Sequence, residues 1–159
     1  MDKWVIVDLD GTLALIEYRL HFLKGERKEM HERVDPDWDG FNRACVSYPV
    51  NSKVRELVNH LAETGYKIII MTGRNRKYAR ETVFWLKENH VRNHLLMMRD
   101  EKDYRPDTEV KLGMLKKMID LDYITDKEQV LCVLEDREKV VDFWRSLGLL
   151  CLQVQKGLY

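Results

Sequence analysis

Two carboxylates one residue apart, Asp8 and Asp10, follow an apolar, strand-like run near the start of the chain. A parallel strand that is buried on both faces has a continuous Val/Ile/Leu sequence, and 4–7 fits this pattern. Ligands of open α/β sheets bind outside the carboxyl ends of such strands. Alternate side chains of a strand point the same way, so the two anions need a cation or a shared proton. Mg²⁺ suits them because it binds hard carboxylate and phosphate oxygens. The alternative is a chemically idle Asp-Gly turn.

Three further polar groups stand at predicted strand ends or helix starts. Thr72 and Arg74 lie between a strand and a helix, where free N–H groups and the helix dipole favour an anion, although Thr72 could be an ordinary N-cap. Lys111 lies just inside a helix, where a lysine is usually solvated. Glu135 and Asp136 directly follow a buried strand, although acids also favour helix starts without any metal. Together these groups could converge in one crevice.

The elements that must position these groups alternate along the whole chain. This alternation predicts an α/β fold with a doubly wound parallel sheet, formed as one domain over residues 1–159. Beside the first strand, further strands are expected at 66–71, 94–99, 129–134 and 149–154. Helices are expected at 53–63 and 75–89, around 110–119 and around 140–147, with a short one after a cap at Asp35 or Asp37.

Composition narrows the class of protein. The 159 residues are 34% charged and 45% hydrophobic, which is typical of a globular chain. The formal net charge of zero gives no support for a broad electrostatic footprint on nucleic acid, although a small site could still grip the end of a strand. The sequence contains neither a membrane-length apolar run nor a signal-peptide pattern, and its three cysteines are widely spaced, so we expect a cytoplasmic protein.

The order Asp-Leu-Asp-Gly-Thr, strand-Thr-Gly-Arg, helix lysine and strand-Glu-Asp resembles the haloacid dehalogenase (HAD) superfamily of phosphatases. The resemblance implies a Rossmann-like core and a nucleophile, Asp8, that takes the phosphoryl group. It makes Asp10 the general acid/base, which also offers its backbone carbonyl to Mg²⁺. Thr72 would hydrogen-bond the phosphoryl oxygens, and Lys111 would neutralise the nucleophile and the phosphate. Such a group of residues provides covalent and electrostatic catalysis.

The same resemblance assigns the metal site to Asp8, Asp10, Glu135 and Asp136. Glu135 departs from the family pattern, in which aspartate is commoner at this position. Its longer side chain could shift the metal geometry or leave direct ligation to Asp136. The sequence does not decide between these two arrangements.

A closer resemblance is to the 3′-phosphatase domain of bacteriophage polynucleotide kinase/phosphatase. It is carried by the stretch 134–154 and by matches at Arg19, Arg74 and Asp107, and it implies that these residues and the adjoining Gly73 bind substrate. Arg19 could equally be a surface arginine. No phosphate loop of the Gly-x-x-x-x-Gly-Lys-Ser/Thr type is present, so no kinase half is expected. The segment 21–49 is too short for more than a minimal cap insertion, which favours an open site.

Two further groups have open interpretations. Four basic residues near one helix start could contact a phosphate backbone, but a solvated helix face is the simpler interpretation; they are Arg74, Arg76, Lys77 and Arg80. Three aromatic residues could stack a base, although packing is the commoner role; they are Trp38, Phe41 and Tyr48.

The function expected from these observations is a Mg²⁺-dependent phosphomonoesterase that works through an aspartyl-phosphate. Its substrate would be a phosphorylated nucleic-acid end, carrying a 3′-phosphate, or a nucleotide, with a phage origin and a role in nucleic-acid repair implied by the resemblance. The alternatives are a 5′(3′)-deoxyribonucleotidase, a small-metabolite phosphatase and a non-catalytic interaction module of the same fold.

Overall fold

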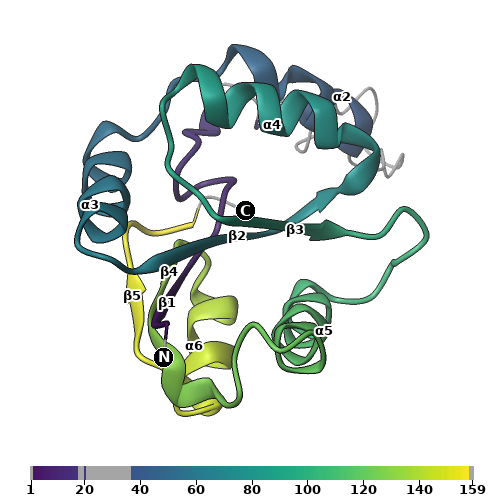
Figure 1. Cartoon of the computed structure of the whole chain (residues 1–159). Helices are drawn as coiled ribbons and strands as arrows, with labels where there is room; N and C mark the ends of the chain where they lie inside the picture. The colour runs from purple at the N-terminus through teal and green to yellow at the C-terminus, as the bar shows by residue number, and fades with distance from the viewer. Residues whose placement is uncertain (1, 18–19, 21–36, 158–159) are drawn as a thin grey trace.

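Five parallel strands form one sheet in the computed structural model, which describes residues 2–17, 20 and 37–157. The strands are β1 (Trp4–Val7), β2 (Lys67–Asn75), β3 (Leu95–Arg99), β4 (Val130–Glu135) and β5 (Cys151–Gln153). Their spatial order is β3-β2-β1-β4-β5 (Figure 1). The chain moves outward from β1 through β2 to β3 and then returns to the other side of β1. This reversal creates the kind of crevice in which doubly wound folds bind ligands.

Helices cover both faces of the sheet, which confirms the predicted α/β fold (Figure 1). On one face α3 (Ser52–Glu63) and α4 (Ala79–Glu88) pack on a core that includes Val5, Val7 and Trp85. On the other face α5 (Asp107–Asp120) and α6 (Glu138–Ser146) pack on a core that includes Ile6 and Trp144. Because successive side chains of β1 alternate between these two cores, the strand is buried throughout and its position is fixed.

The short helix α2 (Trp38–Arg43) begins where one of the two proposed caps stands. The Asp37 carboxylate accepts a hydrogen bond of 2.8 Å from the backbone N–H of Gly40, which confirms Asp37 as its N-cap. The other candidate, Asp35, lies outside the described residues, as does most of the segment expected to form the minimal cap insertion. A 3₁₀ turn (Ala44–Ser47) then leads toward α3.

The prediction for the end of the second strand was wrong. The expected strand ended at Met71 with a helix from Asn75, but β2 continues to Asn75 and its pairing with β3 shifts register between Thr72 and Asn75. Asn75 caps a 3₁₀ turn (Arg76–Tyr78), and α4 begins only at Ala79. Thr72 is therefore inside a strand and is not a helix N-cap. Pairing with β3 outweighs the local turn preference of Gly73.

The fold bears on two expectations, one about membrane-spanning segments and one about the cysteines. In the described part of the chain no helix combines the length and apolar character needed to cross a membrane. Cys45, Cys132 and Cys151, widely spaced in the sequence, are buried free thiols, and a buried free cysteine packs as a small hydrophobic residue.

Candidate active site

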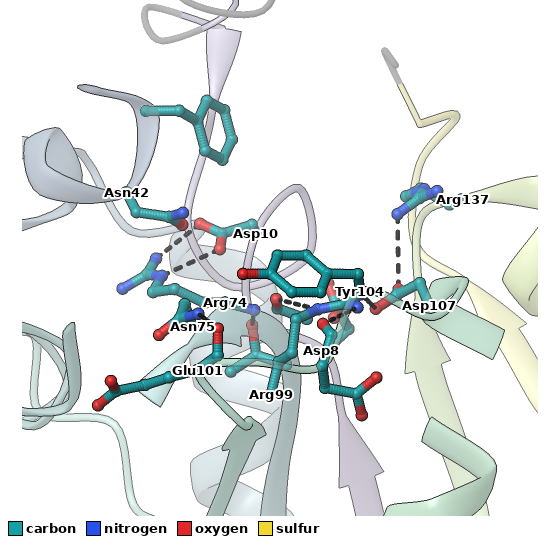
Figure 2. A pocket seen from close by; sticks show the side chains of 14 residues that line it. Asp8, Asp10, Asn42, Arg74, Asn75, Arg99, Glu101, Tyr104, Asp107 and Arg137 are labelled. Carbon is teal, nitrogen blue, oxygen red and sulfur yellow. Dashed lines mark hydrogen bonds and ion pairs between the residues drawn. The ribbon is translucent and has the colours of Figure 1, made fainter. Parts of the chain in front are cut away.

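A cavity of about 370 Å³ opens at the carboxyl ends of β1 and β2, as expected for this fold (Figure 2). Its lining contains many of the predicted site residues: Asp8, Asp10, Thr72, Gly73, Arg74 and Asp107. It also contains residues that sequence reasoning missed, Asn42, Asn75, Arg99, Glu101, Asp103, Tyr104 and Arg137. Arg19 lies outside the described residues.

Three buried carboxylates meet beside this cavity. One oxygen each from Asp8, Glu135 and Asp136 lies within 4.8 Å of the others. Burial, together with the negative charge of Glu135, raises the pKa of Asp8 well above its ordinary value despite the nearby Lys111. The same two causes raise the pKa of Asp136 to about 7. Three anions in such proximity favour a bound cation or proton, so the donor set fits Mg²⁺.

The two acids at the end of β4, Glu135 as its last residue and Asp136 directly after it, have different surroundings. Glu135 uses both oxygens within the protein, since Oε2 accepts a bond of 2.6 Å from Lys111 and Oε1 accepts from the backbone N–H groups of Asp136 and Arg137. Asp136 Oδ2, in contrast, is buried and has no hydrogen-bond partner within the described residues. A β-carbon at Gly11 would lie 2.2 Å from this oxygen, and Gly11 has a φ of +92°. The loop therefore needs glycine there to leave Asp136 its space.

Lys111 is buried, with 2% of its surface exposed, and not solvated. Its Nζ lies 2.7 Å from Asp8, 2.6 Å from Glu135 and 3.5 Å from Asp107. Burial alone would lower the pKa of Lys111, but the charges of these three carboxylates outweigh it and raise the pKa well above its ordinary value. The lysine is therefore charged and is the counter-ion of Asp8.

Asp10 lies apart from this acidic cluster and faces Arg74 (Figure 2). Arg74 donates to both oxygens of Asp10, at 3.1 Å from Nε and 2.6 Å from Nη2, and its Nη1 donates to Thr82 Oγ1 at 2.9 Å. Thr82 in turn donates to the backbone carbonyl of Tyr78 at 2.8 Å. All these groups are buried, and the ion pair with Asp10 raises the pKa of Arg74 against the effect of burial. This bidentate pairing fixes the orientation of the Asp10 carboxylate.

We expect Arg74→Lys to reduce kcat for phosphate release about 10- to 100-fold. Lysine keeps the charge but cannot form the bidentate contact, and a lost bond to a charged group costs about 1.5–3 kcal/mol. Steady-state assays with Arg80→Lys as the matched control would test this, because Arg80 is an exposed arginine on the following helix. Equal activities of the two variants would show that Arg74 does not position Asp10.

Thr72 and Asp107 complete the lining. Thr72 is buried, and its hydroxyl accepts a bond of 3.1 Å from the backbone N–H of Arg74. The Asp107 carboxylate lies among three cations, 3.2 Å from Arg99 and 3.5 Å from both Lys111 and Arg137. Arg99 also donates to the carbonyl of Gly73 at 2.9 Å. Arg99 ends the third strand, so the strand-end rule that identified the other groups could also have identified it.

The groups with open interpretations lie mainly around the rim. Arg76 is paired with Asp100 at 2.8 Å and Lys77 with Asp39 at 2.6 Å, so together with Arg74, which is paired with Asp10, three of the four basic residues are locally neutralised. Phe41 is buried and lines the cavity. The Tyr48 carbonyl accepts a bond of 2.8 Å from the Trp85 indole. The side chain of Trp38 is outside the described part of the structure.

Comparison with known proteins agrees with this geometry. The family model of the polynucleotide kinase PNKP phosphatase domain matches residues 2–159. The chain belongs to the PNKP phosphatase domain family. This membership places it among the HAD-type phosphatases, as the motif order indicated.

Solved structures of other proteins are similar to this chain in fold and, for two of them, in sequence. Two chains from structures of the Pnkp1/Rnl/Hen1 RNA repair complex match with TM-scores of 0.73 and 0.76, at 31% and 30% identity. Both matches cover 99% of this chain but only 44% and 47% of those chains, so it spans less than half of their length. A HAD-superfamily hydrolase from Ehrlichia chaffeensis shares the fold, with a TM-score of 0.60, 16% identity and coverage of 99% and 89%.

Proposed function

We propose that this protein is a Mg²⁺-dependent phosphomonoesterase that removes 3′-phosphates from nucleic-acid ends. The observation that supports it most is the position of Asp8. Its carboxylate lines an open cavity and is held at 2.7 Å by a buried lysine, next to an acid with an unpaired oxygen. A strand end is favoured as substrate because the two matched chains, at about 30% identity, come from an RNA repair complex.

In this proposal Asp8 attacks the phosphorus atom, the bond from phosphorus to the 3′-oxygen breaks, and an aspartyl-phosphate forms. Lys111, at 2.7 Å, favours the ionised form of Asp8 against the opposing effects of burial and Glu135, and it offsets negative charge on the transferring group. Thr72 and Gly73 lie on the cavity wall where they can hydrogen-bond the phosphoryl oxygens. Hydrolysis of the aspartyl-phosphate then returns free Asp8 and inorganic phosphate.

Asp10 serves as the proton carrier in both steps. As paired with Arg74, it is a base that can take a proton from the water that attacks the aspartyl-phosphate. A substrate phosphate that draws the N–H donors of Arg74 to itself would free Asp10 to hold the proton that the leaving 3′-oxygen requires. Arg74 would then bind the Asp10 carboxylate before the substrate enters and the substrate phosphate afterwards.

We assign metal ligation to Asp8 and Asp136, with a contribution from the backbone carbonyl of Asp10 and with Glu135 as the residue that holds Lys111 and the following turn. Asp136 Oδ2 has no hydrogen-bond partner among the residues that the structure describes, whereas both oxygens of Glu135 are bonded within the protein. When bound, Mg²⁺ supplies positive charge that polarises the phosphoryl oxygens. Asp8 keeps a second oxygen beyond its bond to Lys111, so it can be nucleophile and ligand.

Release of inorganic phosphate from a 3′-phosphorylated oligonucleotide, a matching 5′-phosphorylated one and a panel of mononucleotides tests the proposed substrate. Each reaction is run with Mg²⁺ and with a chelator. We expect the 3′-phosphorylated strand to be preferred by at least about tenfold in kcat/KM and chelation to abolish the reaction. Preference for mononucleotides would identify a nucleotidase, and unchanged activity after chelation would overturn the metal assignment.

A further inference from the structure

An aromatic ring stands exposed at the mouth of the active-site cavity. Tyr104 lines the same cavity as Asp8 and Asp10, yet 88% of its surface is exposed. Figure 2 shows Tyr104 within the group of labelled side chains that line the cavity. It belongs to the loop between β3 and α5, which is part of the wall of the site. Single exposed aromatic residues are common on protein surfaces, so exposure alone does not identify a binding residue. What matters for Tyr104 is whether the surrounding loop holds it in a fixed position.

The backbone on both sides of this ring is tightly fixed. The Asp103 carboxylate accepts three bonds from Arg105, at 3.1 Å from the backbone N–H, 2.9 Å from Nε and 2.6 Å from Nη2. Arg99 Nη1 donates to the carbonyls of Asp103 and Arg105 at 3.1 and 2.6 Å. Tyr104 is therefore presented by a loop that is pre-organised from within, which reduces the entropy lost when a ligand packs on the ring.

The charges around the ring favour a neutral partner. Glu101 and Asp103 line the same cavity, Asp103 is already paired with Arg105 at 2.6 Å, and Arg99 is occupied by Asp107 and by the loop carbonyls. Arg137, another arginine of the cavity wall, is paired with Asp107 at 3.5 Å. Because Arg99, Arg105 and Arg137 are already paired with carboxylates, a second phosphate would have to displace a carboxylate, whereas a nucleobase offers a planar uncharged face. Stacking of a base on an aromatic side chain is worth about 1–3 kcal/mol and tolerates any sequence.

We propose that Tyr104 is a stacking platform for the nucleobase of the terminal nucleotide, so that the enzyme recognises the last nucleoside of a strand in addition to its phosphate. This inference rests on the proposed function, because it places the terminal phosphate at Asp8. It makes Tyr104 a specificity-determining residue. The site then requires a base at the end and accepts all four.

Binding by Asp8→Asn protein, which cannot turn the substrate over, tests the inference. The probe is a 3′-phosphorylated oligonucleotide with fluorescent 2-aminopurine as its last base, whose emission is quenched by stacking. We expect the Asp8→Asn parent to quench it and the added Tyr104→Ala to remove the quenching and raise Kd about 5- to 150-fold. Tyr104→Phe keeps the ring and should behave like the parent. Lys102→Ala is the matched control, since it shortens an exposed side chain of the same loop that does not line the cavity.

A strand that ends in an abasic 3′-phosphate separates stacking from a general effect of the loop. We expect the parent to bind this strand more weakly and Tyr104→Ala to add less than a twofold change. Equal losses on the base-bearing and abasic strands, or quenching that survives Tyr104→Ala, would overturn the inference. So would the absence of quenching in the parent. Failure of the proposed function appears separately, as wild-type protein that binds and quenches the probe without releasing phosphate.

Discussion

The Asp8→Asn protein is expected to retain its fold and to lose phosphatase activity by at least about 1,000-fold, as enzymes do when their nucleophile is removed. The amide has the shape of the carboxylate but cannot form the aspartyl-phosphate. The fold should not suffer, because burial and Glu135 already disfavour the charged form of Asp8. Lys111 keeps Glu135 at 2.6 Å as a partner. Phosphate release and thermal unfolding by circular dichroism measure the two effects.

Asp120→Asn is the matched control for this prediction. It makes the same chemical change on an exposed residue at the end of α5 and should leave activity unaltered. An Asp8→Asn protein as active as this control would show that Asp8 is not the nucleophile. A protein that has lost both activity and its cooperative unfolding transition would contradict the expectation that the buried amide is tolerated.

Lys111→Met should cause the largest loss of stability, about 3–5 kcal/mol in the free energy of unfolding. Removal of one partner from a buried ion cluster leaves the others uncompensated, and such losses lie in this range. Here three carboxylates lose one shared cation within 3.5 Å. Urea unfolding measures the change. Lys116→Met, an exposed position on the same helix, should stay within about 0.5 kcal/mol of wild type.

The Lys111→Met deficit should also depend on pH. The pKa of Asp8 lies well above its ordinary value even with the lysine present, and loss of this cation raises it further. Between the unfolded pKa of about 4 and the raised folded pKa, the folded protein binds more protons than the unfolded chain. Stability therefore falls as pH rises through this window. Unfolding curves at pH 5 and pH 8 should show that Lys111→Met loses less free energy of unfolding, relative to wild type, at pH 5. Equal losses at the two pH values would mean that the charged carboxylates are not the cause of the lost stability.

The sequence was informative where one local pattern dominates. The apolar run of β1 and the acids that follow β1 and β4 predicted the layered sheet and the edge on which the cavity lies, because a buried parallel strand has few other sequence patterns. Lys111 was included in the site only because other polar groups accompany it, and its role came from the resemblance, since an isolated helix lysine gives no local signal of burial.

What could not be predicted depends on contacts between distant segments. The extension of β2 past Thr72 requires β3 as a neighbour, and the pairing of Arg74 with Asp10 joins residues 64 positions apart. Tyr104 was missed because its role depends on a loop held from within by Arg99 and Arg105, and no periodic pattern marks such a loop. Helix and strand propensities describe short stretches of sequence, whereas these three features depend on contacts that form only in the folded protein.

The last described residues brace the loop that carries the first carboxylates. Asp136 accepts bonds at its backbone carbonyl from Gln153 Nε2 at 2.8 Å and from the Gly157 N–H at 2.9 Å. Gln155, 144 positions after Gly11, donates to the carbonyl of that glycine. Ribosomes add about 5–20 residues per second, so roughly 7–30 s separate the synthesis of these two partners. For most of this interval, until residues 130–135 have been made, β1 lacks its neighbour β4, and its apolar run is a ready target for chaperones in the emerging chain.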